Sequence, residues 1–205
     1  METTEKNMEH KILEAAEKLF IEQGFTKTTT GQIAKSAGCN QALVHYYYRT
    51  KDNLFEKIFE KKIRFMLTHF LTINSAELSF EEKITRMIAA HLDFLKQNSH
   101  LVPFLLNEMV SNPERLKAVI VKIQDYPKSF LLQLSADLNK EIEKGTIRQI
   151  SPIDLLLTII SLNVFAFWAK PILVTALNIS DKEFQQILEH RKQEITETVL
   201  SRLKK

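Results

Sequence analysis

The chain has 205 residues, of which 44% are hydrophobic and 26% are charged, so a disordered or fibrous class is excluded. Four Gly and five Pro make up about 4% of the chain, where average usage gives about 12%, so the turn residues of a sheet-rich fold are missing. The single Cys39 excludes an internal disulfide and suits a reducing compartment. The amino terminus lacks the pattern of a signal peptide. We therefore expect an all-α protein of the cytoplasm.

Charge is distributed unevenly along the chain. Lys and Arg number 28 against 25 Asp and Glu, and this net charge of +3 is too small by itself to indicate nucleic-acid binding. However, the segment from Gln23 to Lys51 contains four basic residues and no acid, whereas the segment from Glu2 to Glu22 contains six acids and three lysines. A locally cationic segment thus follows an acidic helix.

The first four predicted elements are helices with clear start and stop signals. Gly24 ends the first helix, Thr29 and Gln32 form a capping box that starts the second, and Asn40 caps the third. A long amphipathic helix follows, with apolar residues at helical spacing. The predicted ranges are Glu9–Gln23, Thr30 to Ala37–Gly38, Gln41–Tyr48 and Asp52–Leu71.

The rest of the chain also shows helical periodicity and no sustained strand alternation. Pro171 lies inside one of the predicted helices, so we expect a kink or an early end there. The predicted helices are Phe80–Gln97, Leu101–Val110, a short piece after Pro113, Lys128–Lys144, Pro152–Leu177 and Ser180–Leu203. The uncharged stretch of the Pro152–Leu177 helix runs only from Leu155 to Ala169, shorter than the roughly 20 residues of a membrane span, so we interpret it as a buried helix.

The second and third helices are short and joined by a turn at Gly38, which is typical of a helix-turn-helix. In that motif the second short helix enters the major groove and the first crosses the DNA backbone. Gly38 would supply the positive φ of the turn, and the small Ala34 and Ala37 would let the helices approach closely.

The same segment also carries a set of family landmarks. Thr29-Thr30, Ile33-Ala34 and Ala37-Gly38 are followed by the aromatic cluster Tyr46-Tyr47-Tyr48 and by Lys51-Asp52-Asn53-Leu54. In this combination the segment from Phe25 to Phe55 resembles the tetracycline-repressor-like (TetR) family of bacterial regulators. The resemblance implies an all-helical homodimer that binds operator DNA and is released by a small molecule.

The resemblance also assigns roles to individual residues. Hydroxyls and lysines position a protein on phosphate, whereas Gln pairs with adenine and Leu contacts a thymine methyl. We expect Tyr48 in the core and the two preceding tyrosines on the DNA side. The implied phosphate and sugar contacts are Thr29, Thr30, His45, Tyr47 and Lys51, and the implied base contacts are Gln41, Ala42, Leu43 and Tyr46.

Two domains follow from this organisation: residues 1–52 as the helix-turn-helix domain and residues 53–205 as a helical effector-binding and dimerisation domain. The resemblance implies an effector pocket in the second domain, although the residues alone favour a place in the core for each single aromatic there. An apolar lining favours a hydrophobic effector. The pocket candidates are Phe65, His69, His91, Phe94, Phe104, Asn107, Phe130, Asn163, Phe167 and Trp168.

Apolar residues surround nearly the whole Pro152–Leu177 helix, which indicates a second buried face. A central helix of a monomer and a dimer interface fit this pattern equally well. Because one recognition helix reads few bases, DNA geometry favours a homodimer through the last two helices.

Catalysis has little support, since the sequence shows no phosphate loop, nucleophile elbow or catalytic triad. We expect no cofactor, no metal site and no membrane partner. Two alternatives to a ligand-released repressor remain. One is an architectural or cell-division DNA-binding protein of the same fold without an effector, and the other is a helical small-molecule carrier.

Overall fold

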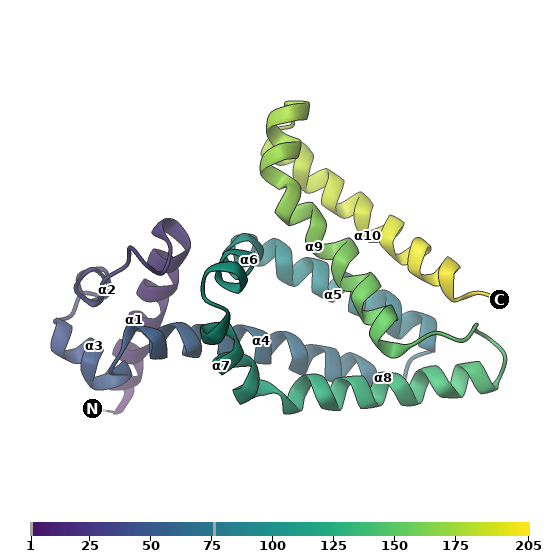
Figure 1. Cartoon of the computed structure of the whole chain (residues 1–205), viewed down its shortest axis with the longest axis horizontal. Helices are drawn as coiled ribbons and strands as arrows, with labels where there is room; N and C mark the ends of the chain where they lie inside the picture. The colour runs from purple at the N-terminus through teal and green to yellow at the C-terminus, as the bar shows by residue number, and fades with distance from the viewer. Residues whose placement is uncertain (1, 76) are drawn as a thin grey trace. The chain divides into compact units, whose positions relative to one another are not determined.

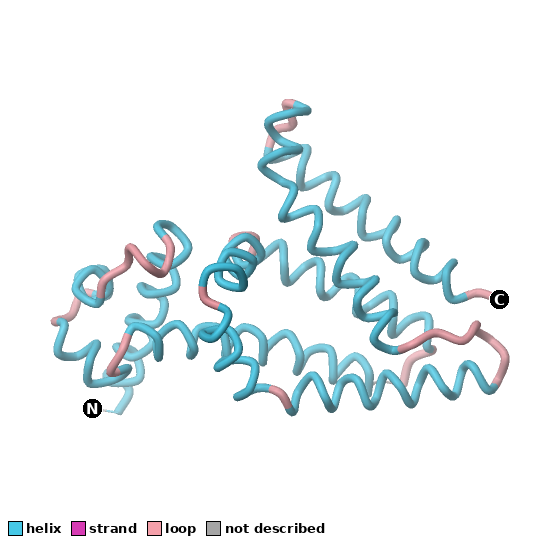
Figure 2. The backbone as a smooth tube through the Cα atoms, viewed as in Figure 1, coloured by secondary structure: helices cyan, strands magenta, loops and turns pink. Residues whose placement is uncertain are grey.

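The computed structural model describes residues 2–75 and 77–205, and this part of the chain is helical with no strand (Figure 2). The helices, labelled in Figure 1, are α1 (Glu2–Gln23), α2 (Thr30–Ala37), α3 (Gln41–Tyr48), α4 (Lys51–Ser75), α5 (Phe80–Gln97), α6 (Leu101–Ser111), α7 (Pro113–Ile123), α8 (Asp125–Glu143), α9 (Pro152–Leu177) and α10 (Asp181–Leu203). The predicted all-α class is confirmed.

Helix ends follow the predicted capping signals. The Thr29 side chain accepts a hydrogen bond from the backbone N–H of Gln32, and the Thr29 backbone N–H donates to Oε1 of the Gln32 side chain, which completes the capping box of α2. Asn40 caps α3 through the N–H of Leu43. Gly38 adopts φ +72°, a left-handed conformation that glycine reaches without a Cβ penalty. The sharp turn between α2 and α3 therefore depends on these local residues.

Three predicted helix ends are wrong by more than one residue: the start of the first helix, the end of α4, which is Ser75 rather than Leu71, and the start of α8, which is Asp125 rather than Lys128. The first helix begins at Glu2 rather than near Glu9, because Glu, Lys and Met favour helix even where no apolar periodicity marks it. The ninth helix has the predicted bounds Pro152–Leu177, so the early end expected at Pro171 does not occur. Proline removes one backbone donor, yet α9 continues through it, although its residues after Ala169 are half-buried or exposed.

The chain folds into two compact units. The first contains the chain up to Arg64 together with Phe104–Ile123, and the second contains Phe65–Pro103 and Gln124–Lys205. The predicted domain boundary at residue 52 stays a prediction.

Aromatic side chains form the core of the first unit. Phe55 stacks on Phe59 with ring centroids 4.5 Å apart, and Phe104 of α6 stacks on Phe59 at 5.5 Å. Phe25 meets Phe55 edge-on at 5.5 Å. These rings connect the end of α1 to the start of α4 and to α6, so the helix-turn-helix shares its core with α6.

In the second unit α5, α9 and α10 pack against one another, and α8 packs on α9. The interior includes a polar pair: Asn163 donates from Nδ2 to Nδ1 of His91, at 3.1 Å, and to the backbone oxygen of Ile88, at 3.3 Å. Asn163 is fully buried, and His91 is 5% exposed. Burial lowers the pKa of His91 to about 4, so its ring is neutral at physiological pH.

Helix α9 has two apolar faces. Leu155, Ile159 and Phe167 are buried within the second unit. A second set at helical spacing is exposed: Ile153, Leu157, Ile160, Phe165, Trp168 and Ile172. Among the described residues α9 is also the one helix long and apolar enough to cross a membrane, by length and composition only.

Candidate DNA-binding site

Helix α3 buries one side and exposes the other. Val44 and Tyr48 are buried, and Tyr48 also donates from its hydroxyl to the backbone oxygen of Glu9 at 3.1 Å. Tyr46 is 75% exposed, and Tyr47 is half-buried with its ring edge-on to Tyr46 at 5.1 Å. The predicted division of the three tyrosines therefore matches their burial, because adjacent helical residues cannot all point inward.

The exposed face of α3 carries the residues predicted to contact bases. Gln41 and Ala42 are exposed and Leu43 is half-buried. The Gln41 side chain donates from Nε2 to the Thr30 hydroxyl at 2.8 Å, which fixes the start of α3 against the start of α2. Two helix amino ends thus lie together, and amino ends favour anions such as phosphate.

The capping threonine is already occupied. The Thr29 hydroxyl and backbone N–H both contact the Gln32 side chain, at 3.2 and 2.8 Å. To contact phosphate, Thr29 would therefore have to give up its hydrogen bonds with Gln32. Thr30, the next residue, lies in the first turn of α2 and is not part of the capping box.

His45 closes the turn that leads to α4. The Arg49 backbone N–H donates to the His45 carbonyl oxygen at 2.9 Å, and Nδ1 of His45 contacts the Arg49 carbonyl oxygen at 2.9 Å. Since a carbonyl only accepts, Nδ1 carries the proton and a neutral ring offers only an acceptor at Nε2. The two bonds hold Arg49 at φ +58°, which is unusual for a residue with a side chain. His45 therefore stabilises the turn, and its sugar or phosphate contact stays a prediction.

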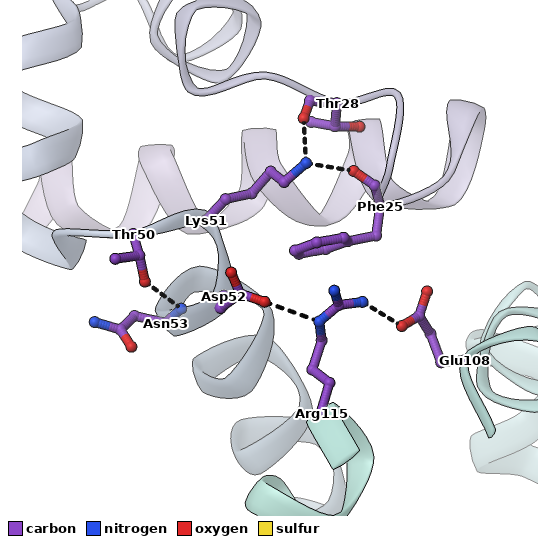
Figure 3. Close-up of polar contacts among 8 residues, drawn as sticks. All are labelled: Phe25, Thr28, Thr50, Lys51, Asp52, Asn53, Glu108 and Arg115. Carbon is purple, nitrogen blue, oxygen red and sulfur yellow. Dashed lines mark hydrogen bonds and ion pairs between the residues drawn. The ribbon is translucent and has the colours of Figure 1, made fainter. Parts of the chain in front are cut away.

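Lys51 is directed into the protein. Its ammonium donates to the backbone oxygens of Phe25 and Thr28, both at 2.8 Å, and lies 4.2 Å from the centroid of the Phe25 ring (Figure 3). Burial lowers the pKa of this lysine. The structure thus gives Lys51 a role in holding the turn before α2. Its predicted phosphate contact would have to use an N–H of the ammonium that does not already donate to these two carbonyl oxygens.

Comparison with known families decides what this arrangement belongs to. A family model of bacterial regulatory proteins of the tetR family matches residues 12–58, and a tetracyclin repressor-like C-terminal domain model matches residues 81–199. The chain belongs to the TetR family. It is accordingly a DNA-binding transcriptional regulator and not an enzyme.

Individual relatives agree with this membership. The HTH-type transcriptional regulator YhgD of Bacillus subtilis (strain 168), itself uncharacterized, is 26% identical over 141 residues, covering 69% of this chain and 72% of that protein. The fatty acid metabolism regulator protein of the same organism is 22% identical over 138 residues, covering 67% and 70%. The solved structure of Bacillus subtilis FadR with stearoyl-CoA has a TM-score of 0.70 at 20% identity, covering 95% of this chain and 98% of that chain. That structural likeness shows a shared fold.

The structure of this TetR-family regulator does not bring the ten effector candidates together. Phe65, His69 and Phe94 line a hollow of about 190 Å³ beside Phe70, between α4 and α5. Buried in the second unit are His91, Phe130, Asn163 and Phe167. Trp168 is 51% exposed and Asn107 is also exposed, while Phe104 packs in the aromatic core of the first unit. All ten assignments stay predictions.

Sequence reasoning missed three residues beside the helix-turn-helix: Phe25, Glu108 and Arg115. Glu108 is the sole charged residue in the largely apolar α6 and is 2% exposed. That isolated carboxylate was the signal, because a buried charge requires a partner.

Among residues 2–75 and 77–205 no group of three His, Cys, Asp or Glu is arranged to hold a metal ion.

Proposed function

We propose that this regulator is a homodimeric repressor that binds a palindromic operator and leaves it when a long, apolar effector binds the second unit. The exposed face of α3, with Gln41 fixed on Thr30 and Tyr46 projecting, carries the proposal. Phosphate contacts would come from Thr29, Thr30 and residues near them, and base contacts from α3. We place the DNA-binding domain at residues 1–52 and the protein in the cytoplasm, where the operator is found.

Dimerisation is supported by the outer face of α9. Trp168 and Phe165 pack on each other at 5.7 Å, yet both are more than half exposed. Exposed aromatic and aliphatic residues at helical spacing are typical of an interface. A two-fold copy of α9 and α10 would cover them and make a four-helix bundle. Two recognition helices would then reach half-sites about one DNA turn apart, roughly 34 Å.

The effector class is supported by the relatives and by the lining of the hollow. One relative is named as a regulator of fatty acid metabolism, and the FadR structure holds stearoyl-CoA. In this chain the hollow is lined largely by apolar side chains but has only about 190 Å³, below the roughly 300–1,000 Å³ of most ligand sites. A long acyl chain would therefore have to displace side chains such as Phe70. Such a displacement supplies the differential affinity that release from DNA requires.

The first experiment is selection of bound duplexes from a random DNA pool. A palindromic enriched site supports the proposal, and the variants Gln41→Ala and Tyr46→Ala should lose it while remaining dimeric. Lys117→Met, at an exposed position on α7, is the matched control. Weak, sequence-independent binding that disappears in modest salt would favour an architectural protein instead.

Oligomeric state tests the interface. Trp168→Glu places a charge on the outer face of α9 and should yield a monomer in analytical ultracentrifugation. Leu132→Glu, at a 72% exposed position on α8, should remain dimeric. A dimeric Trp168→Glu variant would exclude the proposed interface.

Effector class is tested by adding palmitoyl- and stearoyl-CoA, free coenzyme A and palmitate to the operator complex. Release by the acyl thioesters alone supports the proposal. Release by none of them, from a dimer that binds its palindrome, would leave the operator function intact and overturn the effector class.

A further inference from the structure

Arg115 of α7 connects three parts of the first unit. Its Nε lies 2.9 Å from the Asp52 carboxylate at the start of α4, and its Nη1 pairs with Glu108 of α6. Its guanidinium carbon lies 3.5 Å from the centroid of the Phe25 ring (Figure 3). The Arg115 side chain is 15% exposed and Glu108 is 2% exposed, so their pair is largely shielded from water, whereas the Asp52 carboxylate is more than half exposed.

Phe25 is held from both sides. Figure 3 shows its ring between the Lys51 ammonium and the Arg115 guanidinium, and each cation is close enough to attract the ring electrons. Lys51 also binds the carbonyl oxygens of Phe25 and Thr28. Thr28 directly precedes Thr29, the cap of α2. An unbroken series of contacts therefore runs from Glu108 through Arg115, Phe25 and Lys51 to the amino end of α2.

Stability alone is a poor reason for this series. Glu108 is 2% exposed, and a buried ion pair is often no more stabilising than apolar residues of the same volume. The pair instead fixes the orientation of the Arg115 side chain. A planar guanidinium that is shared between two carboxylates and stacked on a ring has one orientation. The neighbouring Lys117 of α7 forms an exposed ion pair with Glu114 of the same helix. Arg115 differs from it because its contacts join α7 to other parts of the first unit.

We propose that Arg115 is a positioning residue for DNA binding: through Phe25 and Lys51 it sets the amino end of α2, without itself contacting DNA. The DNA-binding surface then depends on a side chain more than sixty residues beyond the recognition helix. This inference rests on the operator binding proposed above and adds to it the dependence on α6 and α7.

The main test is Arg115→Met in the full-length protein, with Lys117→Met as the matched control on the same helix. Operator affinity of Arg115→Met should fall about 2- to 30-fold, the usual range for side chains that couple separate parts of a protein. The slope of log affinity against log salt should match wild type, because no phosphate contact is removed. A slope reduced by about 0.9 would reveal direct phosphate contact and overturn the positioning role.

Removing Arg115 leaves the buried Glu108 unpaired, so the double variant E108Q/R115M is measured as well. It removes both charges, should keep the wild-type unfolding midpoint more closely, and should still bind the operator weakly. Arg115→Lys keeps the charge but not the fork and should not restore affinity. Folded variants with wild-type affinity would overturn the proposal.

Coupling to α2 separates positioning from general destabilisation. If Arg115 acts through the amino end of α2, combining Arg115→Met with Thr30→Val should cost less affinity than the two single losses together. Additive losses would overturn the assignment. If wild type itself shows no operator binding, the proposed function fails, whereas wild-type binding with an unaffected Arg115→Met variant refutes this inference alone.

Discussion

Acidification is expected to destabilise the protein through His91. The ring accepts a hydrogen bond from Asn163 at Nδ1, meets Phe70 edge-on at 6.0 Å and is 5% exposed. Protonation would place a positive charge on the nitrogen that receives the amide N–H, inside an apolar interior. The folded protein therefore resists protonation, and its His91 pKa is about 4 against an ordinary 6.5.

The sign follows from proton uptake. Below the ordinary pKa of 6.5 the unfolded chain binds a proton on His91, whereas the folded chain does not until about pH 4. The stabilising contribution of the neutral ring is thus present above this window and is lost as pH falls through it. The loss approaches about 1.4 kcal/mol per pH unit and amounts to about 2 kcal/mol between about pH 7 and pH 5.

Urea unfolding across this range measures the effect. His91→Gln keeps an acceptor for Asn163 but cannot titrate, so its free energy of unfolding should lose about 2 kcal/mol less than wild type on acidification. His69→Gln, at an exposed position on α4, is the control and should follow wild type. Carboxylate titrations are common to all three proteins and cancel in the comparison. Equal acid sensitivity of wild type and His91→Gln would refute the argument.

Three further changes test the local structure. Thr29→Ala removes the capping oxygen of α2 and should lower the free energy of unfolding by about 1 kcal/mol in urea, and an unchanged value would contradict the cap. Tyr48→Phe removes the hydrogen bond to the Glu9 backbone and should lower the free energy of unfolding by about 1 kcal/mol while leaving operator affinity intact. A loss of operator affinity without a loss of stability would instead place Tyr48 in the DNA interface. Phe59→Ala opens the aromatic core, and thermal and urea unfolding should report a loss of about 3–5 kcal/mol, with a loss under 1 kcal/mol excluding a well-packed site.

The helix-turn-helix was predictable because its signals are local. A capping box, an Asn cap and a glycine at the turn each act within four residues, so Thr29, Asn40 and Gly38 fix α2 and α3 without reference to the rest of the chain. The same holds for the division between Tyr48 and Tyr46, which follows from helical spacing alone.

The outcome at Pro171 and the scatter of the effector candidates were not predictable in this way. Proline favours a kink or an end of a helix, but α9 continues through Pro171 to Leu177 although none of its residues after Ala169 is buried. Likewise Phe104 and Phe130 look alike in sequence, but one stacks on Phe59 in the first unit and the other contacts Phe70 in the second. Long-range packing decides which core an aromatic residue joins, and helical periodicity in the sequence does not show this.

Lys51 shows how a residue type can be identified correctly while its contacts are not. A lysine at the start of a helix next to a recognition helix favours phosphate binding, and the family pattern assigns it there. In the structure its ammonium binds the Phe25 and Thr28 carbonyls and faces the Phe25 ring, whose other side is covered by Arg115. No pattern within the helix-turn-helix contains Arg115, because that contact closes a loop of more than sixty residues. On the proposal made for Arg115, the geometry of the candidate DNA-binding surface is set jointly by local capping and by α6 and α7.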